Sequence, residues 1–131
     1  MNRGELRLSR HAHREAPAIM RHTLAAFLTG VGVGPDEQID IVTAVGEALA
    51  NAVEHAYGQG AAGELEMRAS TSGDSELTVT VADRGQFARP HGRTDRGFGL
   101  RIIRAIARSV DVEARAGGTV VSMLFDASPA L

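Results

Sequence analysis

The sequence contains no cysteine and no lysine, and each absence excludes a class of chemistry. Without cysteine the chain has no disulfide, no thiol nucleophile and no zinc–thiolate site. All 14 basic residues are therefore arginine, which removes the phosphate-binding lysine of a P-loop and the lysine of eukaryotic-type protein kinases. Schiff-base catalysis is excluded for the same reason.

Long apolar runs and a strong charge of one sign are also missing. No run reaches membrane-spanning length and no secretory signal pattern is present, so we expect a cytoplasmic protein without a membrane partner. The net charge of −2 offers no basic surface, and we expect no direct contact with nucleic acid. With 131 residues, of which 44% are hydrophobic, the chain is predicted to form a single domain, residues 1–131.

Hydrophobic periodicity predicts the order strand, helix, helix, strand, strand, helix, strand, strand. The predicted strands cover residues 5–9, 64–70, 77–81, 110–116 and 119–125, and the predicted helices cover residues 16–28, 35–58 and 97–109. Strands paired in hairpins with helices gathered between them predict a two-layer α+β sandwich. We expect a mixed, mainly antiparallel sheet with the helices on one face.

The most informative stretch is residues 41–57, which segregates into an apolar and a polar side when it is drawn as a helix. On the polar side Glu47, Asn51 and His55 follow one another at steps of four, so they form one row. A carboxylate, a carboxamide and an imidazole in one row can hold a metal-bound anion and place a base beside it. The alternative is a polar helix face that simply contacts water.

Two glycine-containing segments complete the pattern. Asp83-Arg84-Gly85 follows the strand at residues 77–81, and Gly97-Phe98-Gly99-Leu100 opens the last helix. Each segment by itself is common, because Asp-x-Gly occurs in many turns and Gly-x-Gly in many tight connections. Their occurrence in this order after the polar row is more specific.

The three segments resemble the conserved boxes of the GHKL ATP-binding fold, which gyrase, heat-shock chaperones and histidine kinases share. Residues 47–57 are similar to the asparagine box, in the form closest to the bacterial anti-sigma-factor serine/threonine kinases. Residues 83–85 resemble the first glycine box, residues 97–100 the second, and residues 118–121 the closing strand. The resemblance extends from Leu6 to Phe125.

The resemblance implies a role for each residue of the asparagine box and for the aspartate. Asn51 would offer its side-chain oxygen to Mg²⁺, which bridges phosphate oxygens of ATP. Glu47 would accept the proton of an attacking hydroxyl as general base. Asp83 would accept a hydrogen bond from the adenine amino group. For His55 a ligand contact and a structural hydrogen bond remain equal alternatives.

The glycine boxes would contribute backbone rather than side chains. Gly85 would let the backbone approach the base without a Cβ clash. Gly97 and Gly99 would leave free N–H groups at a helix N-terminus, an anion site that replaces the missing lysine. Leu100 completes the second box, and Thr119 would lie near the adenine.

The segment between the boxes, residues 86–96, would be the ATP lid. Its arginines and the preceding Arg84 would contact phosphates or partner proteins. The family pattern has a second glycine in the first box where this chain has Phe87, and this departure leaves ATP binding and turnover open. On the first helix, Arg21 would dock the sigma factor and the anti-anti-sigma protein, and the alternative is an arginine that only faces solvent.

The family implies an ATP-dependent serine/threonine kinase that uses Mg²⁺ and forms homodimers. It would bind a sigma factor and phosphorylate a serine of an anti-anti-sigma (STAS-type) partner. The alternative is a non-catalytic module that sequesters a partner and retains a degenerate ATP site, which the altered first glycine box motivates. A histidine-kinase catalytic domain fits less well, because the chain has no room for a dimerisation helix pair with a phospho-accepting histidine.

Overall fold

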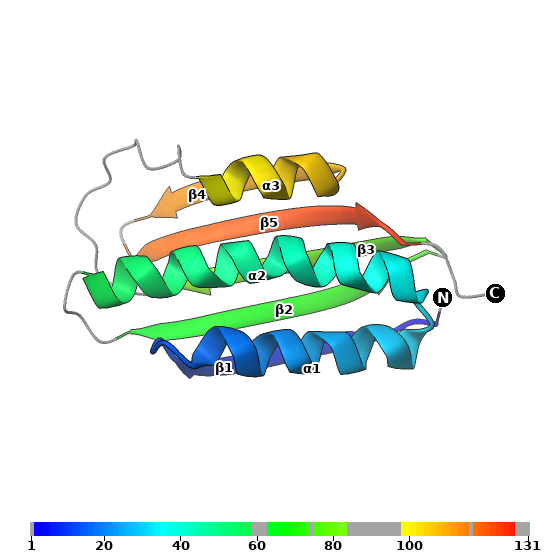
Figure 1. Cartoon of the computed structure of the whole chain (residues 1–131), viewed down its shortest axis with the longest axis horizontal. Coiled ribbons are helices and arrows are strands. Elements are labelled where there is room, and N and C mark those ends of the chain that lie inside the picture. The colour runs from blue at the N-terminus through cyan, green and yellow to red at the C-terminus, as the bar shows by residue number, and fades with distance from the viewer. Residues whose placement is uncertain (1, 59–62, 74, 84–97, 116, 128–131) are drawn as a thin grey trace.

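The computed structural model describes residues 2–58, 63–73, 75–83, 98–115 and 117–127. The expected order of elements is confirmed (Figure 1). The elements are β1 (Glu5–His11), α1 (Ala16–Val31), α2 (Pro35–Gly58), β2 (Glu64–Ser72), β3 (Glu76–Asp83), α3 (Phe98–Ile106), β4 (Ser109–Arg115) and β5 (Gly118–Asp126).

The strands form one five-stranded sheet in the order β1-β2-β3-β5-β4. Each neighbouring pair is antiparallel, so the described sheet is fully antiparallel where we expected a mixed, mainly antiparallel one. The three helices lie side by side on one face of this sheet (Figure 1). The predicted two-layer α+β architecture is confirmed.

Alternation along the strands builds the sheet side of the core. In β3, Leu77, Val79 and Val81 are buried, whereas the intervening Thr78 and Thr80 are only half-buried. Successive side chains of a strand point to opposite faces, so the buried set is the face that the helices cover. The central helix α2 contributes the largest helical share of the core, with buried residues Ile41, Ala44, Val45, Ala48, Leu49, Ala52 and Val53.

The buried stripe of α1 differs from the one expected. The helical pattern of the sequence allows Ile19, Leu24, Phe27 and Leu28 to share one face. In the structure Met20, Leu24 and Leu28 are fully buried, whereas Ile19 and Phe27 are half-buried. The buried residues step by four, so they form a single row against the sheet and α2. Ile19 and Phe27 lie beside that row, and Phe27 packs against the margin of the core.

The connection between α1 and α2 is set by local backbone chemistry. Gly32 has the left-handed φ of 91° that ends α1, and the Val33 N–H donates to the Leu28 carbonyl at 2.9 Å. The next helix begins at Pro35, with Asp36 and Glu37 in its first turn, where proline costs no hydrogen bond and negative charge favours the helix dipole. The tight link therefore lays α1 beside α2.

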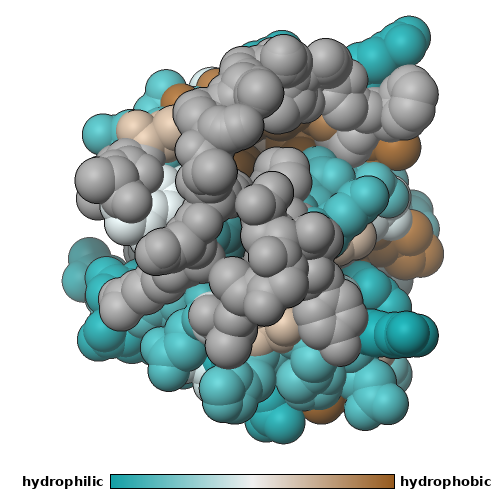
Figure 2. All heavy atoms as spheres, turned by 90° about the vertical axis from the view of Figure 1, so that its left-hand side faces the viewer, coloured by the Kyte–Doolittle hydropathy of each residue, from teal (hydrophilic) through white to brown (hydrophobic). Residues whose placement is uncertain are grey.

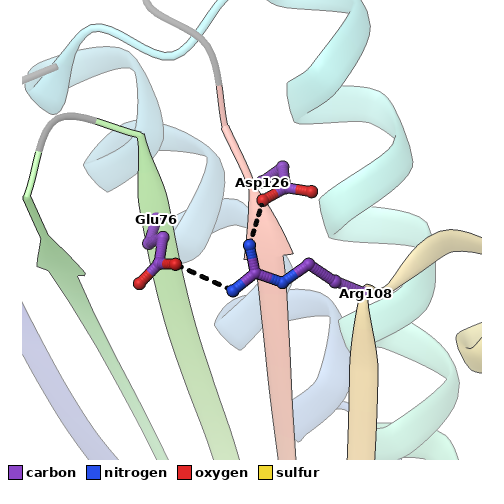
Figure 3. Close-up of polar contacts among 3 residues, drawn as sticks. All are labelled: Glu76, Arg108 and Asp126. Carbon is purple, nitrogen blue, oxygen red and sulfur yellow. Dashed lines mark hydrogen bonds and ion pairs between the residues drawn. The ribbon is translucent and has the colours of Figure 1, made fainter.

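Arg108 attaches the chain after α3 to the sheet (Figure 3). Its guanidinium donates to Asp126 Oδ1 and to Glu76 Oε2, each at 2.8 Å, and its backbone N–H donates to the Leu124 carbonyl at 2.7 Å. The hydrogen bond to Glu76 and the charge of Asp126 raise the pKa of Arg108 above its usual value. The side chains are exposed, so these ion pairs position the chain more than they stabilise it.

The core assignment predicts a large loss of stability on truncation of Phe125, which is 2% exposed on the interior strand β5. Phe125→Ala is expected to lower the free energy of unfolding by about 3–5 kcal/mol, because it removes buried apolar contacts and leaves a cavity. The matched control is Ile39→Ala on α2, where the side chain is 65% exposed and the change is expected to be within about 0.5 kcal/mol. Urea denaturation measures both, and equal losses would contradict the assigned core.

Candidate functional site

One end of the molecule collects the segments that the sequence singles out. The C-terminal end of α2, the last residue of β3 and the first residues of α3 and β5 all lie on the left-hand side of Figure 1. The antiparallel pairing of β3 with β5 is one cause, since it places the end of one strand beside the start of the other. Segments that are far apart in the sequence therefore meet at a single edge of the fold.

The polar row of α2 lies at the margin of the core. Glu47 and Asn51 are both half-buried, and they alternate with the buried Ala48 and Leu49. Neither side chain makes a hydrogen bond or ion pair with the described part of the chain. A carboxylate and a carboxamide thus stand one helical turn apart, and neither is bonded to the described residues. His55 follows in the same helix, but its side chain lies outside the described residues.

Asp83 is the one charged side chain that is buried among the described residues, at 4% exposure. It ends β3 on the face that carries Val79 and Val81, so it points to the helix layer. Burial of a carboxylate is costly unless specific partners compensate for it. A buried aspartate at the end of a strand, beside other polar groups, is therefore a candidate for ligand recognition.

Thr119 lies directly opposite Asp83. The register of β3 and β5 pairs the two residues, and the threonine is half-buried. Opposed residues in an antiparallel pair carry their side chains on the same face, about 5 Å apart. Of the residues proposed to lie near adenine, these two are therefore brought together by the sheet itself.

The second glycine box is described in part. Gly99 lies in the first turn of α3, where backbone N–H groups have no partner within the helix. Leu100 is half-buried and packs against the core. Gly85 and Gly97 lie outside the described residues, as do Phe87 and the arginines predicted for the lid.

Figure 2 views the molecule from the end at which these segments meet. Hydrophilic side chains of the described residues line much of the lower margin of this face, and hydrophobic ones are visible mainly along its right-hand edge.

Within the described residues, no three His, Asp or Glu side chains gather as a ready-made metal site. None of the described helices has the length and apolar character that spanning a lipid bilayer requires.

Sequence reasoning missed one contact near the polar row. The Arg21 side chain of α1 is half-buried and lies against the backbone of Gly46, the residue before Glu47. An isolated glycine within a helical pattern is the signal that could have pointed to this position.

Comparison with known proteins places the fold in one family. The family model for the histidine kinase-like ATPase domain matches residues 10–125. The match covers most of the chain, and the chain belongs to this family. It is an ATP-binding class, so the expectation of ATP as a ligand is supported by the family as well as by the motifs.

Relatives within the class are regulatory proteins of bacteria. The chain is 32% identical to an anti-sigma F factor of Pasteuria penetrans, over 95% of this chain and 91% of that protein. It is also 32% identical to the serine-protein kinase RsbW of Bacillus subtilis, over 83% of this chain and 78% of that protein. The resemblance to the anti-sigma-factor kinases is confirmed by these similarities.

A solved structure shows the same fold. The RsbU and RsbW domains of a Mycobacterium tuberculosis protein align with a TM-score of 0.77 and 25% sequence identity. The alignment covers 98% of this chain, and the chain spans about a third (34%) of the length of that structure. The helix layer and the sheet thus follow an arrangement already seen in part of a larger protein.

Membership of this family predicts that ATP stabilises the folded chain. A ligand that binds only the native state raises the free energy of unfolding by about 2.7 kcal/mol when its concentration is 100 times Kd. We expect the urea midpoint to rise as ATP is added, with inorganic phosphate at the same concentration as the ionic control. A midpoint that stays constant up to millimolar ATP would contradict ATP binding.

Proposed function

We propose that this chain is an ATP-dependent protein serine/threonine kinase of the anti-sigma-factor type. It binds a sigma factor, and it phosphorylates a serine of an anti-anti-sigma partner. The observation that carries the proposal is the pair Glu47 and Asn51, which make no hydrogen bond or ion pair with the described residues, on the helix whose C-terminal end lies at the same edge of the fold as buried Asp83 and Thr119. Relatives named serine-protein kinase and anti-sigma F factor support the same function.

The adenine of ATP would be recognised at the end of β3. Asp83 accepts a hydrogen bond from the adenine amino group, with Thr119 beside it on the neighbouring strand. A buried carboxylate is suited to this task, because a hydrogen bond made out of contact with water discriminates strongly between bases. Gly85 gives the base access to the backbone in this proposal.

The phosphates would be held by the start of α3. Helix N-termini bind phosphate because their free N–H groups and the helix dipole both favour negative charge. Gly97 and Gly99 would present these N–H groups, and Leu100, which packs against the core, would hold the helix start in place. His55, one turn after Asn51, is the further candidate for a nucleotide contact.

Mg²⁺ is the proposed cofactor, and the donor set fits it. Mg²⁺ is bound in nucleotide sites by one or two protein oxygens, by phosphate oxygens and by water, so it needs no dedicated cluster of carboxylates. Asn51 supplies the protein oxygen, and its carboxamide is free of bonds to the described residues. When bound, the ion neutralises charge that develops on the phosphates.

Glu47 is the proposed general base. The serine Oγ of the partner attacks the γ-phosphorus, and the bond from that phosphorus to the β–γ bridging oxygen breaks, so that ADP leaves. The serine proton passes to the Glu47 carboxylate. A carboxylate that no described group holds can take up this proton without first breaking a structural hydrogen bond.

Partner binding is proposed for Arg21, at the face where α1 meets α2. Its guanidinium matches a carboxylate of a docked protein, and arginine binds such groups in a bidentate manner. A cytoplasmic location follows from the proposed substrates, because ATP and sigma factors are found there. We further propose that the kinase works as a homodimer and makes no direct contact with nucleic acid or membrane.

The base assignment predicts a specific loss in Glu47→Gln. Phosphoryl transfer from ATP to the serine of the partner is expected to fall by about 10²–10⁴-fold, because the neutral amide cannot accept the proton. ATP affinity should change little, since the side chain acts on the acceptor. Radiolabel transfer and calorimetric ATP titration measure the two quantities.

Glu54→Gln is the matched control, because Glu54 is an exposed glutamate two turns further along the same helix. It should transfer phosphate at the wild-type rate. If Glu47→Gln is as active as this control, Glu47 is not the base. If the wild type binds ATP and partner but transfers no phosphate, the chain is the non-catalytic sequestering module that its altered first glycine box suggests.

The magnesium assignment is tested with Asn51→Ala. Wild-type ATP affinity should rise on addition of Mg²⁺, and the variant should lose most of this increase because the protein ligand to the ion is gone. Calorimetric titration with ATP is carried out with the ion and with EDTA. Thr43→Ala is the control, because this exposed threonine lies two turns earlier in α2 and, within the described residues, donates only to the Ile39 carbonyl. An equal Mg²⁺ effect in all three proteins would rule Asn51 out as ligand.

A further inference from the structure

Gly46 is buried inside α2, and the Arg21 side chain crosses it from α1. A Cβ placed on this glycine would lie 2.9 Å from Cδ of Arg21, 3.6 Å from Cγ and 3.9 Å from Nε. A carbon–carbon separation of 2.9 Å is well inside van der Waals contact, so any larger residue at position 46 displaces the arginine. The two helices run side by side along the sheet (Figure 1).

We propose that Gly46 is a positioning residue that seats Arg21 across α2. The missing side chain leaves a flat place on the helix, immediately before Glu47, where the arginine stem can lie. The cation is thereby held on the same stretch of helix as the carboxylate of Glu47. This inference rests on the proposed function, in which Arg21 docks the partner and Glu47 acts on its serine.

Glycine is an unfavourable choice for this position unless the space is needed. It is among the poorest helix formers, because it loses the most backbone freedom on folding. Gly30 of α1 gives the comparison within the same chain: its ideal Cβ meets nothing within 4 Å. At Gly46 the vacant space is filled by one particular side chain, and that side chain comes from another helix.

The space above Gly46, called the seat below, holds the aliphatic stem of Arg21 and leaves its charged end available. The arginine is half-buried, yet its guanidinium makes no hydrogen bond or ion pair with the described residues. Long charged side chains commonly pack their aliphatic part while the head group stays accessible. The group that fits this head is a carboxylate on the surface of the serine-bearing partner, because it is planar and accepts two hydrogen bonds.

A fixed cation beside the base would set the register of the docked partner. A carboxylate bound at Arg21 places the partner's chain against the turn of α2 that carries Glu47, so the serine is delivered to one place. Rotational freedom of the arginine would spread the partner over many positions, and correct placement accounts for a large part of the rate in such reactions. The seat therefore acts on partner affinity and alignment rather than on ATP.

The test uses Gly46→Ala, with Gly30→Ala as the matched control. Arg21→Ala and the double variant Arg21→Ala/Gly46→Ala complete a double-mutant cycle. The first readout needs no partner: ¹⁵N relaxation of the Arg21 Nε–H by NMR. We expect restricted motion in the wild type and in Gly30→Ala. In Gly46→Ala the Arg21 signal should become as mobile as that of Arg104, an exposed arginine of α3.

Stability gives a second, independent readout. Alanine favours the helix, so Gly46→Ala should raise the urea midpoint in the Arg21→Ala background. With Arg21 present the gain should be smaller, because the arginine stem loses its packing. Equal shifts in both backgrounds, together with an Arg21 signal that does not change, would overturn the seat.

The functional readout is the steady-state rate of phosphoryl transfer from ATP to the serine-bearing partner protein. This is the same partner that serves as substrate for Glu47→Gln. Gly46→Ala is expected to raise KM for that protein about tenfold, because a charge-assisted contact is weakened, with KM for ATP unchanged. Gly30→Ala should not change KM. A mobile Arg21 with unaltered KM would overturn the link between the seat and the partner. If no transfer occurs in the wild type, the kinase proposal fails, while the NMR and urea readouts still decide whether Gly46 seats Arg21.

Discussion

The packing of α2 on the sheet is the constraint on which the rest of the structure depends. This helix buries one side against the inner face of β3 and β5, and the burial fixes its rotation about its own axis. Glu47 and Asn51 are carried to the margin of the interface by the same rotation, since they occupy the neighbouring stripe of the helix. The core and the polar row are thus two consequences of one amphipathic pattern.

Periodicity alone predicted the elements because each is amphipathic over several turns or alternations. It failed where nonlocal contacts decide the outcome. The last helix was expected to reach residue 109, but α3 ends at Ile106 because the Arg108 backbone joins the sheet through Leu124. Met20 was overlooked in α1, since only the position of the sheet determines which of two adjacent rows is buried.

The candidate site was predictable in its composition and less so in its geometry. Motif resemblance identified the residues of the asparagine box and the aspartate at the end of β3. It could not show that Asp83 is the buried carboxylate of the described residues, or that Gly46 accommodates Arg21. Both facts depend on neighbours from distant parts of the chain, which a local pattern does not encode.

The pairing of Asp83 with Thr119 belongs to the same ladder that pairs Val81 with Val121 and Leu77 with Phe125. A slip of one residue would turn all of these side chains to the opposite face, so this part of the site cannot shift without unfolding the core. The contact of Arg21 with Gly46 is made by a side chain between two helices, so no strand register fixes it. Substitutions between α1 and α2 leave this ladder intact, so the proposed docking side can change while the proposed nucleotide side stays fixed.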